Sequence, residues 1–173
     1  MLLKDPLKLD ISYMTESGAV KYATNSGDGS WIKATIDEKL GFDWAESETS
    51  LGVDSKGRVH IAYYDRSKGD LKYANNVSSE WKKEVVDGEG SVGSFSSLRI
   101  DDDDHVHISY QDKSGNRLKY AQNTLGVWQM ISTTREGGSI GSYSSLALGK
   151  EPRVEMSSYD ARTKDLSYNS KLL

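Results

Sequence analysis

Several residue types are scarce or missing from this 173-residue chain. It has no cysteine, which excludes a disulfide framework and any thiol chemistry. It also has no run of about 18 apolar residues, so the sequence predicts no membrane-spanning helix. The opening residues 1–4 are too short for a signal peptide before Asp5 and Pro6 interrupt them. Because secreted and intracellular proteins can both lack cysteine, the cellular compartment stays unknown.

Charge is not concentrated in any part of the chain. The 22 Lys and Arg and the 26 Asp and Glu give a formal net charge of −4, and the two signs are interspersed. Proteins that bind nucleic acid or acidic membranes carry a basic patch that attracts the phosphates. We therefore expect neither nucleic acid nor a membrane as a partner.

Aliphatic residues are few, with 36% hydrophobic residues and a mean hydropathy of −0.63. Ten tyrosines and four tryptophans offset this shortage. Aromatic rings bury a large area while their polar atoms find hydrogen-bond partners. We therefore expect buried aromatic rings to compensate for the shortage of aliphatic residues.

One pattern occurs four times along the chain. The segments 59–65 (VHIAYYD) and 71–74 (LKYA) recur at 106–112 and 118–121, and in altered form at 9–23 and 154–168. The anchor residues Ile11, Ile61, Ile108 and Met156 are 50, 47 and 48 residues apart. A regular spacing of this size is typical of repeat architectures such as propellers.

Each repeat reads as four short strands. In the second repeat we expect strands at 51–53, 59–64, 71–74 and 81–86, separated by turn residues at 54–57 and 65–70. No stretch has the 3.6-residue periodicity of a helix. The sequence predicts an all-β fold, a β-propeller of four-stranded antiparallel blades.

The repeats divide residues 1–173 into one propeller unit of about four blades. We expect blades at about 1–50, 51–97, 98–145 and 146–173, with residues 1–3 as the first inner strand and no outer strand in the last blade. The ring could close alone, close with a second copy, or be part of a longer protein. Because an unpaired blade face is a large apolar patch, we expect self-association or completion by another segment.

Three elements carry a resemblance to a known group of proteins. They are His-Ile-(Ala/Ser)-Tyr-x-Asp at 60–65 and 107–112, Leu-Lys-Tyr-Ala-x-Asn at 71–76 and 118–123, and Ser-Leu at 50–51 and 97–98. They resemble the repeats of uncharacterised bacterial and archaeal β-propeller proteins, loosely similar to sialidase-like propellers. The resemblance covers nearly the whole chain and implies a propeller that is often secreted and has no agreed activity. The Ser-x-Asp-x-Gly-x-Thr-Trp box of sialidases is absent, so sialidase activity is not carried over.

Two groups of residues invite a metal interpretation. His60 and His107 share a repeat position with Asp10 and Glu155, but equivalent positions in different blades are too far apart for bonds of about 2 Å. We expect them to make hydrogen bonds between blades. The acidic run 101–104 coincides with an ordinary turn between strands and lacks the spacing of a calcium loop. The sequence predicts no metal site and no cofactor.

Trp44 breaks the repeat pattern. It lies with Asp43 and Glu46 where the other repeats have loops rich in Gly and Ser, between an outer strand and the next inner strand. We expect this loop to share a face with the turns that follow Asp65 and Asp112. An exposed Trp there could stack on a sugar ring or anchor a protein partner, or it could simply pack locally.

Three aspartates, Asp65, Asp112 and Asp160, end the second strand of their repeats. Each could cap the following turn, or together they could form an acidic rim that receives sugar hydroxyl groups. Tyr64 and Tyr143 complete the candidate binding residues, and residues 94–97 and 142–145 approach the central channel as connections into the inner strands.

These residues favour a non-enzymatic propeller that presents one loop face to a glycan or a protein. The alternative is a carbohydrate-active enzyme, of the glycoside hydrolase or lyase type, that uses carboxylates and tyrosines of that face. A third interpretation is a purely structural segment of a larger ring. The sequence shows no nucleophile with an activating base, so no catalytic residue is assigned.

Overall fold

A computed structural model describes residues 8–25, 29–78, 80–133, 138–149 and 153–172. They form fourteen strands in four antiparallel sheets, and none of these residues lies in a helix. None of them therefore belongs to a helix long and apolar enough to cross a membrane. The all-β class and the sheets of three or four strands confirm the prediction.

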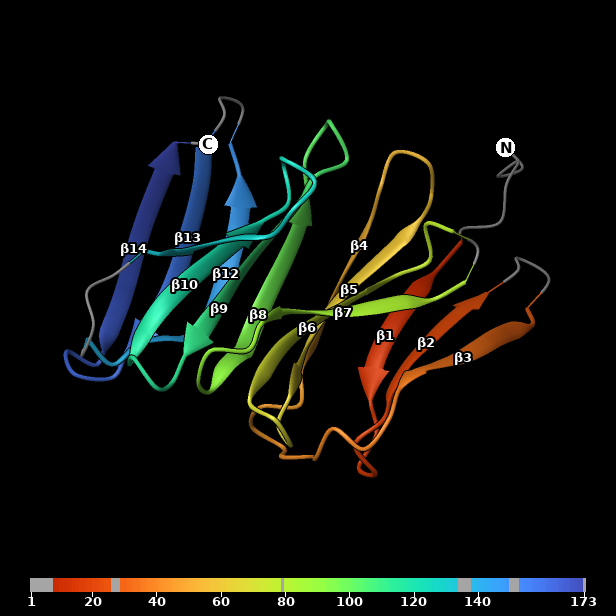
Figure 1. Cartoon of the computed structure of the whole chain (residues 1–173), viewed down its shortest axis with the longest axis horizontal. Helices are drawn as coiled ribbons and strands as arrows, with labels where there is room; N and C mark the ends of the chain where they lie inside the picture. Colours follow the sequence, from red (N-terminus) through yellow and green to blue (C-terminus); the bar gives the residue numbers. More distant parts are fainter. Residues whose placement is uncertain (1–7, 26–28, 79, 134–137, 150–152, 173) are drawn as a thin grey trace.

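The strands of each sheet pair with their neighbours in sequence (Figure 1). The first sheet contains β1 (Asp10–Met14), β2 (Val20–Asn25) and β3 (Trp31–Asp37). The second contains β4 (Thr49–Val53), β5 (Val59–Asp65), β6 (Asp70–Asn75) and β7 (Lys82–Asp87). The third contains β8 (Val92–Ile100), β9 (Val106–Asp112), β10 (Arg117–Gln122) and β11 (Gln129–Ser132). The fourth contains β12 (Ile140–Leu148), β13 (Arg153–Asp160) and β14 (Asp165–Leu172) and, in the described part of the chain, no outer strand.

Two inner strands differ from the prediction. The segments 94–97 and 142–145, expected as connections, lie inside β8 and β12, so the predicted blade boundaries cut through these strands. Gly93 and Phe95 adopt positive φ angles of 113° and 53°, and the strand register shifts on both sides of Ser94. These bulges keep a glycine- and serine-rich stretch within the sheet. The inner strand expected at residues 1–3 lies outside the described residues.

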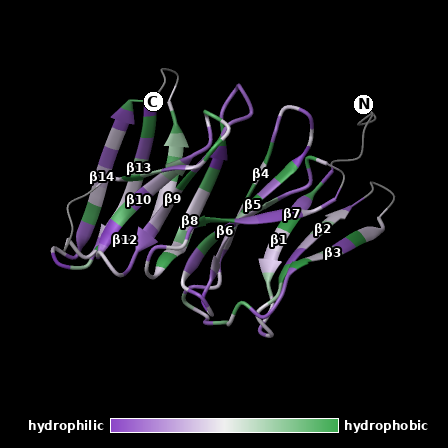
Figure 2. Cartoon of the chain, in the orientation of Figure 1, coloured by the Kyte–Doolittle hydropathy of each residue, from purple (hydrophilic) through white to green (hydrophobic). Residues whose placement is uncertain are grey.

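Apolar residues fill the space between consecutive sheets. The first interface joins Val20, Tyr22, Ile36 and Leu40 to Val59, Ile61, Tyr63 and Ala74. The second joins Ala62, Leu71, Tyr73 and Val86 to Leu98, Val106, Ile108 and Tyr110. The third joins Leu118 and Tyr120 to Leu146, Val154 and Met156. Each core is therefore a sandwich between two blades, built mainly from aliphatic side chains with one or two tyrosines in each. Figure 2 shows hydrophilic residues between the hydrophobic ones along the strands and in the turns.

Buried ion pairs add to the first two interfaces. Asp87, at the end of β7, accepts hydrogen bonds from Tyr110 Oη (2.7 Å) and Lys119 Nζ (2.5 Å) of the third sheet. Asp37, at the end of β3, likewise accepts from Tyr63 and Lys72 of the second sheet. Burial raises the pKa of Asp37, but hydrogen bonds from Lys72 and Lys83 outweigh this effect and lower the pKa to about 2.

The four sheets form an open arc. In Figure 1 the first and last sheets lie at opposite ends of a row, with the second and third between them. The face of the last sheet that points away from the third sheet is not covered by any described residue, and its apolar side chains are exposed. Leu166 and Tyr168 are 71% and 61% exposed, whereas their repeat equivalents Leu71 and Tyr73 are 0% and 3% exposed. The described residues therefore do not close a ring by themselves.

Candidate functional site

The loops that leave the outer strands and the turns between second and third strands meet on one side of the arc. Leu40 N donates to Gly18 O (3.0 Å), and Ser67 N donates to Leu40 O (2.8 Å). In the next repeat, Val92 N donates to Gly69 O (2.8 Å). This confirms that the two kinds of connection lie on the same side of the arc, which we call the loop face.

Trp44 projects from a well-braced loop on this face. Asp43 Oδ1 accepts a hydrogen bond from Ala45 N (2.9 Å), and Asp43 N donates to Ser47 Oγ (2.8 Å). The Trp44 ring meets the Phe42 ring edge to face, with their centroids 5.0 Å apart, yet Trp44 remains 81% exposed. The loop therefore exposes a large aromatic surface to solvent. Its own hydrogen bonds and the Phe42 contact restrict the movement of this surface.

Charged side chains tie this loop to the turns of two blades. Arg66 Nη1 lies 3.0 Å from Glu46 Oε2 and 3.3 Å from Asp43 Oδ2. Lys113, in the corresponding turn of the third sheet, forms an ion pair with the same Glu46 carboxylate. Glu46 thus bridges the second and third repeats beside Trp44.

Tyr64 extends the group of contacts. Lys113 Nζ lies 5.6 Å from the centroid of the Tyr64 ring, and Tyr64 Oη lies 3.0 Å from Ser91 Oγ. The structure therefore brings together four of the candidate residues with two basic ones. We call this set the loop-face cluster: Asp43, Trp44, Glu46, Tyr64, Arg66 and Lys113.

Sequence reasoning missed Arg66 and Lys113. Each directly follows a strand-ending aspartate, Asp65 or Asp112, so comparison of the turns could have shown a basic residue at one repeat position. The sequence could not show that both side chains turn toward Glu46. That contact depends on how far the loop reaches across two blades.

The three strand-ending aspartates are buried and serve their own turns. Asp65 Oδ1 accepts from Ser67 N (3.1 Å) and Ser67 Oγ (2.7 Å). Asp112 accepts from Gly115 N and from Arg117 Nε, both at 2.8 Å, and Asp160 caps the turn that follows it in the same way. Their exposed fractions are 2%, 2% and 6%, so their carboxylates do not form a rim open to solvent.

Tyr143 lies in the last sheet, apart from the loop-face cluster. It is 65% exposed, has a φ of 54°, and its ring centroid lies 4.6 Å from that of Phe95. With Tyr159 and Leu166 it lines a cavity of about 350 Å³. This cavity shares Leu166 with the bare outer face of the last sheet.

The two repeated histidines form hydrogen bonds with residues of their own repeats. His60 Nε2 lies 3.2 Å from Asp54 Oδ2, and its Nδ1 meets the Tyr73 hydroxyl group. His107 is paired with Asp101 (3.1 Å) and Tyr120 (2.5 Å) in the same manner. The prediction of hydrogen bonds between blades was wrong, because Asp and Tyr of the same repeat already occupy both ring nitrogens. Among the described residues, no three acidic, His or Cys side chains are placed to hold a metal ion.

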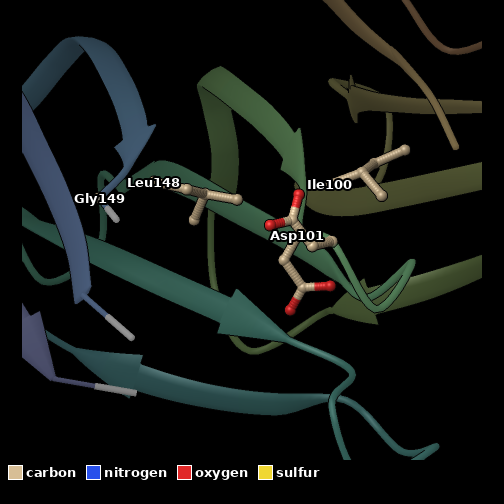
Figure 3. A pocket seen from close by; sticks show the side chains of 5 residues that line it. Ile100, Asp101, Leu148 and Gly149 are labelled. Atoms are coloured by element: carbon tan, nitrogen blue, oxygen red, sulfur yellow. The ribbon is translucent and has the colours of Figure 1, made fainter. Parts of the chain in front are cut away.

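A second cavity, of about 280 Å³, lies between the ends of β8 and β12, where these strands turn away from the loop face; Figure 3 shows its lining residues. Ile100 and Asp101 line it from the end of β8, and Leu148 and Gly149 from the end of β12. The Asp101 carboxylate already accepts hydrogen bonds from His107 and from the backbone of His105. It therefore offers a ligand few free oxygen lone pairs.

The acidic run at 101–104 acts as a turn and as a link between blades. Asp104 Oδ1 accepts from Ser55 N and Asp104 Oδ2 from Ser55 Oγ, both at 2.8 Å. The run forms the predicted turn, and Asp102 and Asp103 are exposed. Its last carboxylate joins the second repeat to the third.

Comparison with known proteins supports the fold. No protein family model matches the chain, and no curated protein matches it. The structure is similar to a lectin from Aleuria aurantia in complex with Fucα1-6GlcNAc (TM-score 0.59, 11% identity, covering 93% of this chain and 51% of the lectin). It is also similar to the intramolecular trans-sialidase of Ruminococcus gnavus in complex with oseltamivir carboxylate (TM-score 0.56, 12% identity, covering 96% of this chain and 40% of the trans-sialidase). A third similar structure is the leech intramolecular trans-sialidase with 2,7-anhydro-Neu5Ac (TM-score 0.58, 13% identity, covering 95% of this chain and 29% of the trans-sialidase).

These structures define the class to which the fold belongs. The chain is built as blades of a β-propeller, and its neighbours include lectin and sialidase-like propellers. It spans about half the length of the lectin and less of the two trans-sialidases. The similarity is to arcs within larger proteins.

Proposed function

We propose that the chain is a non-enzymatic binding module whose loop face takes up a carbohydrate. The observation that carries this proposal is Trp44, exposed on a braced loop beside the ion-paired side chains of Arg66, Glu46 and Lys113. An aromatic ring can stack on the apolar face of a sugar, and neighbouring charged groups can bind its hydroxyl groups. A flat aromatic surface with a polar border suits such a ligand.

The neighbouring structures support the carbohydrate over other ligands. The Aleuria aurantia lectin is in complex with a fucosylated disaccharide, and the leech trans-sialidase with a sialic acid derivative. Those ligands are bound by the neighbouring proteins. For this chain they suggest that fucosylated and sialylated glycans should be tested first in a binding assay.

Binding agrees better with the geometry than hydrolysis does. A glycoside hydrolase needs two carboxyl groups that face each other across the scissile bond. Asp43 and Glu46 instead point to the same nitrogen, Nη1 of Arg66, and Glu46 also pairs with Lys113. Their charges are therefore already balanced within the cluster.

We also propose that the arc works as part of a larger ring, completed by another chain or segment. The outer faces of the first and last sheets carry apolar residues that are buried at the same repeat positions inside the arc. Exposed apolar sheet faces of this size favour association.

The loop-face proposal is tested with a glycan array and the Trp44→Ala variant. Loss of a stacking tryptophan should weaken binding roughly 30-fold, equivalent to about 2 kcal/mol. The matched control is Trp31→Ala, which removes a tryptophan that is 43% exposed at the start of β3, outside the loop face.

Binding that does not change in Trp44→Ala, or that falls equally in Trp31→Ala, would remove the proposal. Release of free sugar from a bound glycan would instead favour the carbohydrate-active enzyme. An array without any bound glycan would direct attention to a protein ligand on the same face.

A further inference from the structure

A tyrosine on the second strand of a blade faces a lysine on the third strand in three of the four sheets. The pairs in register are Tyr13 with Lys21, Tyr63 with Lys72, and Tyr110 with Lys119. The fourth sheet has Ser158 and Ser167 at the corresponding positions. The pair is thus a feature of the repeat that the last blade has lost.

In the second and third sheets the pair has a defined task. It holds an aspartate that ends the outer strand of the preceding sheet, as Tyr110 and Lys119 hold Asp87. The side chains of Lys119 and Asp87 are 9% and 3% exposed, so the ion pair is nearly removed from water. A buried charge that loses its partner costs several kcal/mol, which makes this contact selective for an acidic residue.

In the first sheet the pair has no such aspartate among the described residues. Neither the Tyr13 nor the Lys21 side chain forms a hydrogen bond or an ion pair with any described residue. They lie on the open face with Ile11, which is 45% exposed, whereas its equivalent Ile61 is 0% exposed. The apolar and the polar parts of one blade interface are therefore both present, and both unoccupied by the described chain.

We propose that the open face of the first sheet receives a further propeller blade whose outer strand ends in an aspartate held by Tyr13 and Lys21. This inference rests on the proposed completion of the ring and is independent of glycan binding. The occupant is a blade of the same repeat type with a complete outer strand.

A second copy of the described residues does not meet this requirement. The last sheet, which a copy would bring to this face, ends at its third strand, β14, within the described part of the chain. It therefore has no outer strand to supply the aspartate. Docking of such a copy would bury Lys21 without a counter-ion.

The test uses the full chain with its own residues 51–97 repeated in front of residue 1. The added blade brings a second Asp87 to the position opposite Tyr13 and Lys21. We expect the midpoint of thermal unfolding to fall by roughly 5 °C when this added Asp87 is changed to Asn. The fall should vanish when Tyr13→Phe and Lys21→Met are present, and Glu80→Gln in the added blade should have no effect.

The inference would be overturned if Asp87→Asn in the added blade left the unfolding midpoint unchanged. It would also be overturned if this substitution lowered the midpoint equally in the presence of Tyr13→Phe and Lys21→Met. If the lengthened chain does not fold, amine labelling and sedimentation of the unmodified chain decide the question. A monomer in which Lys21 reacts while Lys119 is protected supports it. A dimer that protects Lys21 makes a second copy the occupant and overturns it. Glycan binding through Trp44 is measured separately, so its failure is distinguishable.

Discussion

Single aspartates at the ends of outer strands join neighbouring blades. Asp87 accepts hydrogen bonds from Tyr110 and Lys119 across the interface. Burial raises the pKa of Asp87, but the hydrogen bonds from Lys119 and Tyr110 outweigh this effect and hold the pKa below its usual range. The carboxylate therefore stays charged, and both sides of the interface depend on it.

Asp87→Asn should lower the free energy of unfolding by about 3 kcal/mol, because Lys119 keeps its charge in a buried site. Denaturant titration measures the loss. Asp103→Asn, on an exposed turn, is the matched control and should change stability by less than about 0.5 kcal/mol. The further change Lys119→Met should restore part of the loss, and no recovery would contradict the pairing.

His60 and His107 predict a dependence of stability on pH. Burial lowers the pKa of both side chains below the ordinary value of 6.5, although the hydrogen bonds that they donate to Asp54 and Asp101 act in the opposite direction. As the pH falls below about 6.5, the unfolded chain binds protons before the folded chain does. Stability is therefore complete above this pH and is lost as the pH falls toward the folded pKa values.

The midpoint of thermal unfolding should consequently decrease between pH 7.5 and pH 5.5. In the double variant His60→Gln, His107→Gln the decrease should be much smaller, since glutamine keeps hydrogen-bonding groups but does not titrate. An equally steep decrease in the double variant would show that other groups cause it.

Among the elements, the inner strand β8 depends on its bulges. A Cβ atom on Gly93 would lie 2.6 Å from the Cα atom of Leu71, and the φ of Gly93 is 113°. Gly93→Ala should therefore cost about 3 kcal/mol through overpacking and backbone strain. Gly57→Ala, at a φ of 75° with no atom within 4 Å, should cost only about 1 kcal/mol. Equal losses in denaturant titrations would contradict the close approach.

The sequence predicted the middle strands well and the inner strands less well. In β5 a run of β-branched and aromatic residues ends at an aspartate, so both the strand and its turn are visible in the sequence. The start of β8 is rich in Gly and Ser, which are weak strand formers, and it is held in the sheet by its pairing with β9 and by the close approach of Gly93 to Leu71. Tertiary contacts of this kind leave no local pattern.

The candidate site was predictable in part for a similar reason. Trp44 and its acidic neighbours break the repeat, and that break is visible in the sequence. The position of Arg66 and Lys113 around Glu46 depends on side-chain directions in three separate connections. The burial of Asp65 in its own turn is likewise a matter of packing.

As a whole molecule, the chain is an arc of blades with two different ends. The first sheet presents Ile11 together with Tyr13 and Lys21, whose side chains have no polar partner among the described residues, and the last sheet presents Leu166 and Tyr168. The loop face runs between these ends, and the cluster around Trp44 joins the loop that follows β3 to turns of the second and third repeats. We propose that the two ends serve assembly and that the centre of the loop face binds the ligand.

The most direct test of this account is a map of backbone amide chemical shifts on addition of the glycan that binds best in the array. We predict shifts at residues 43–47, 66–67 and 113, which form one surface of the loop face. Shifts confined to the opposite turns, 54–57 and 101–104, would contradict the account.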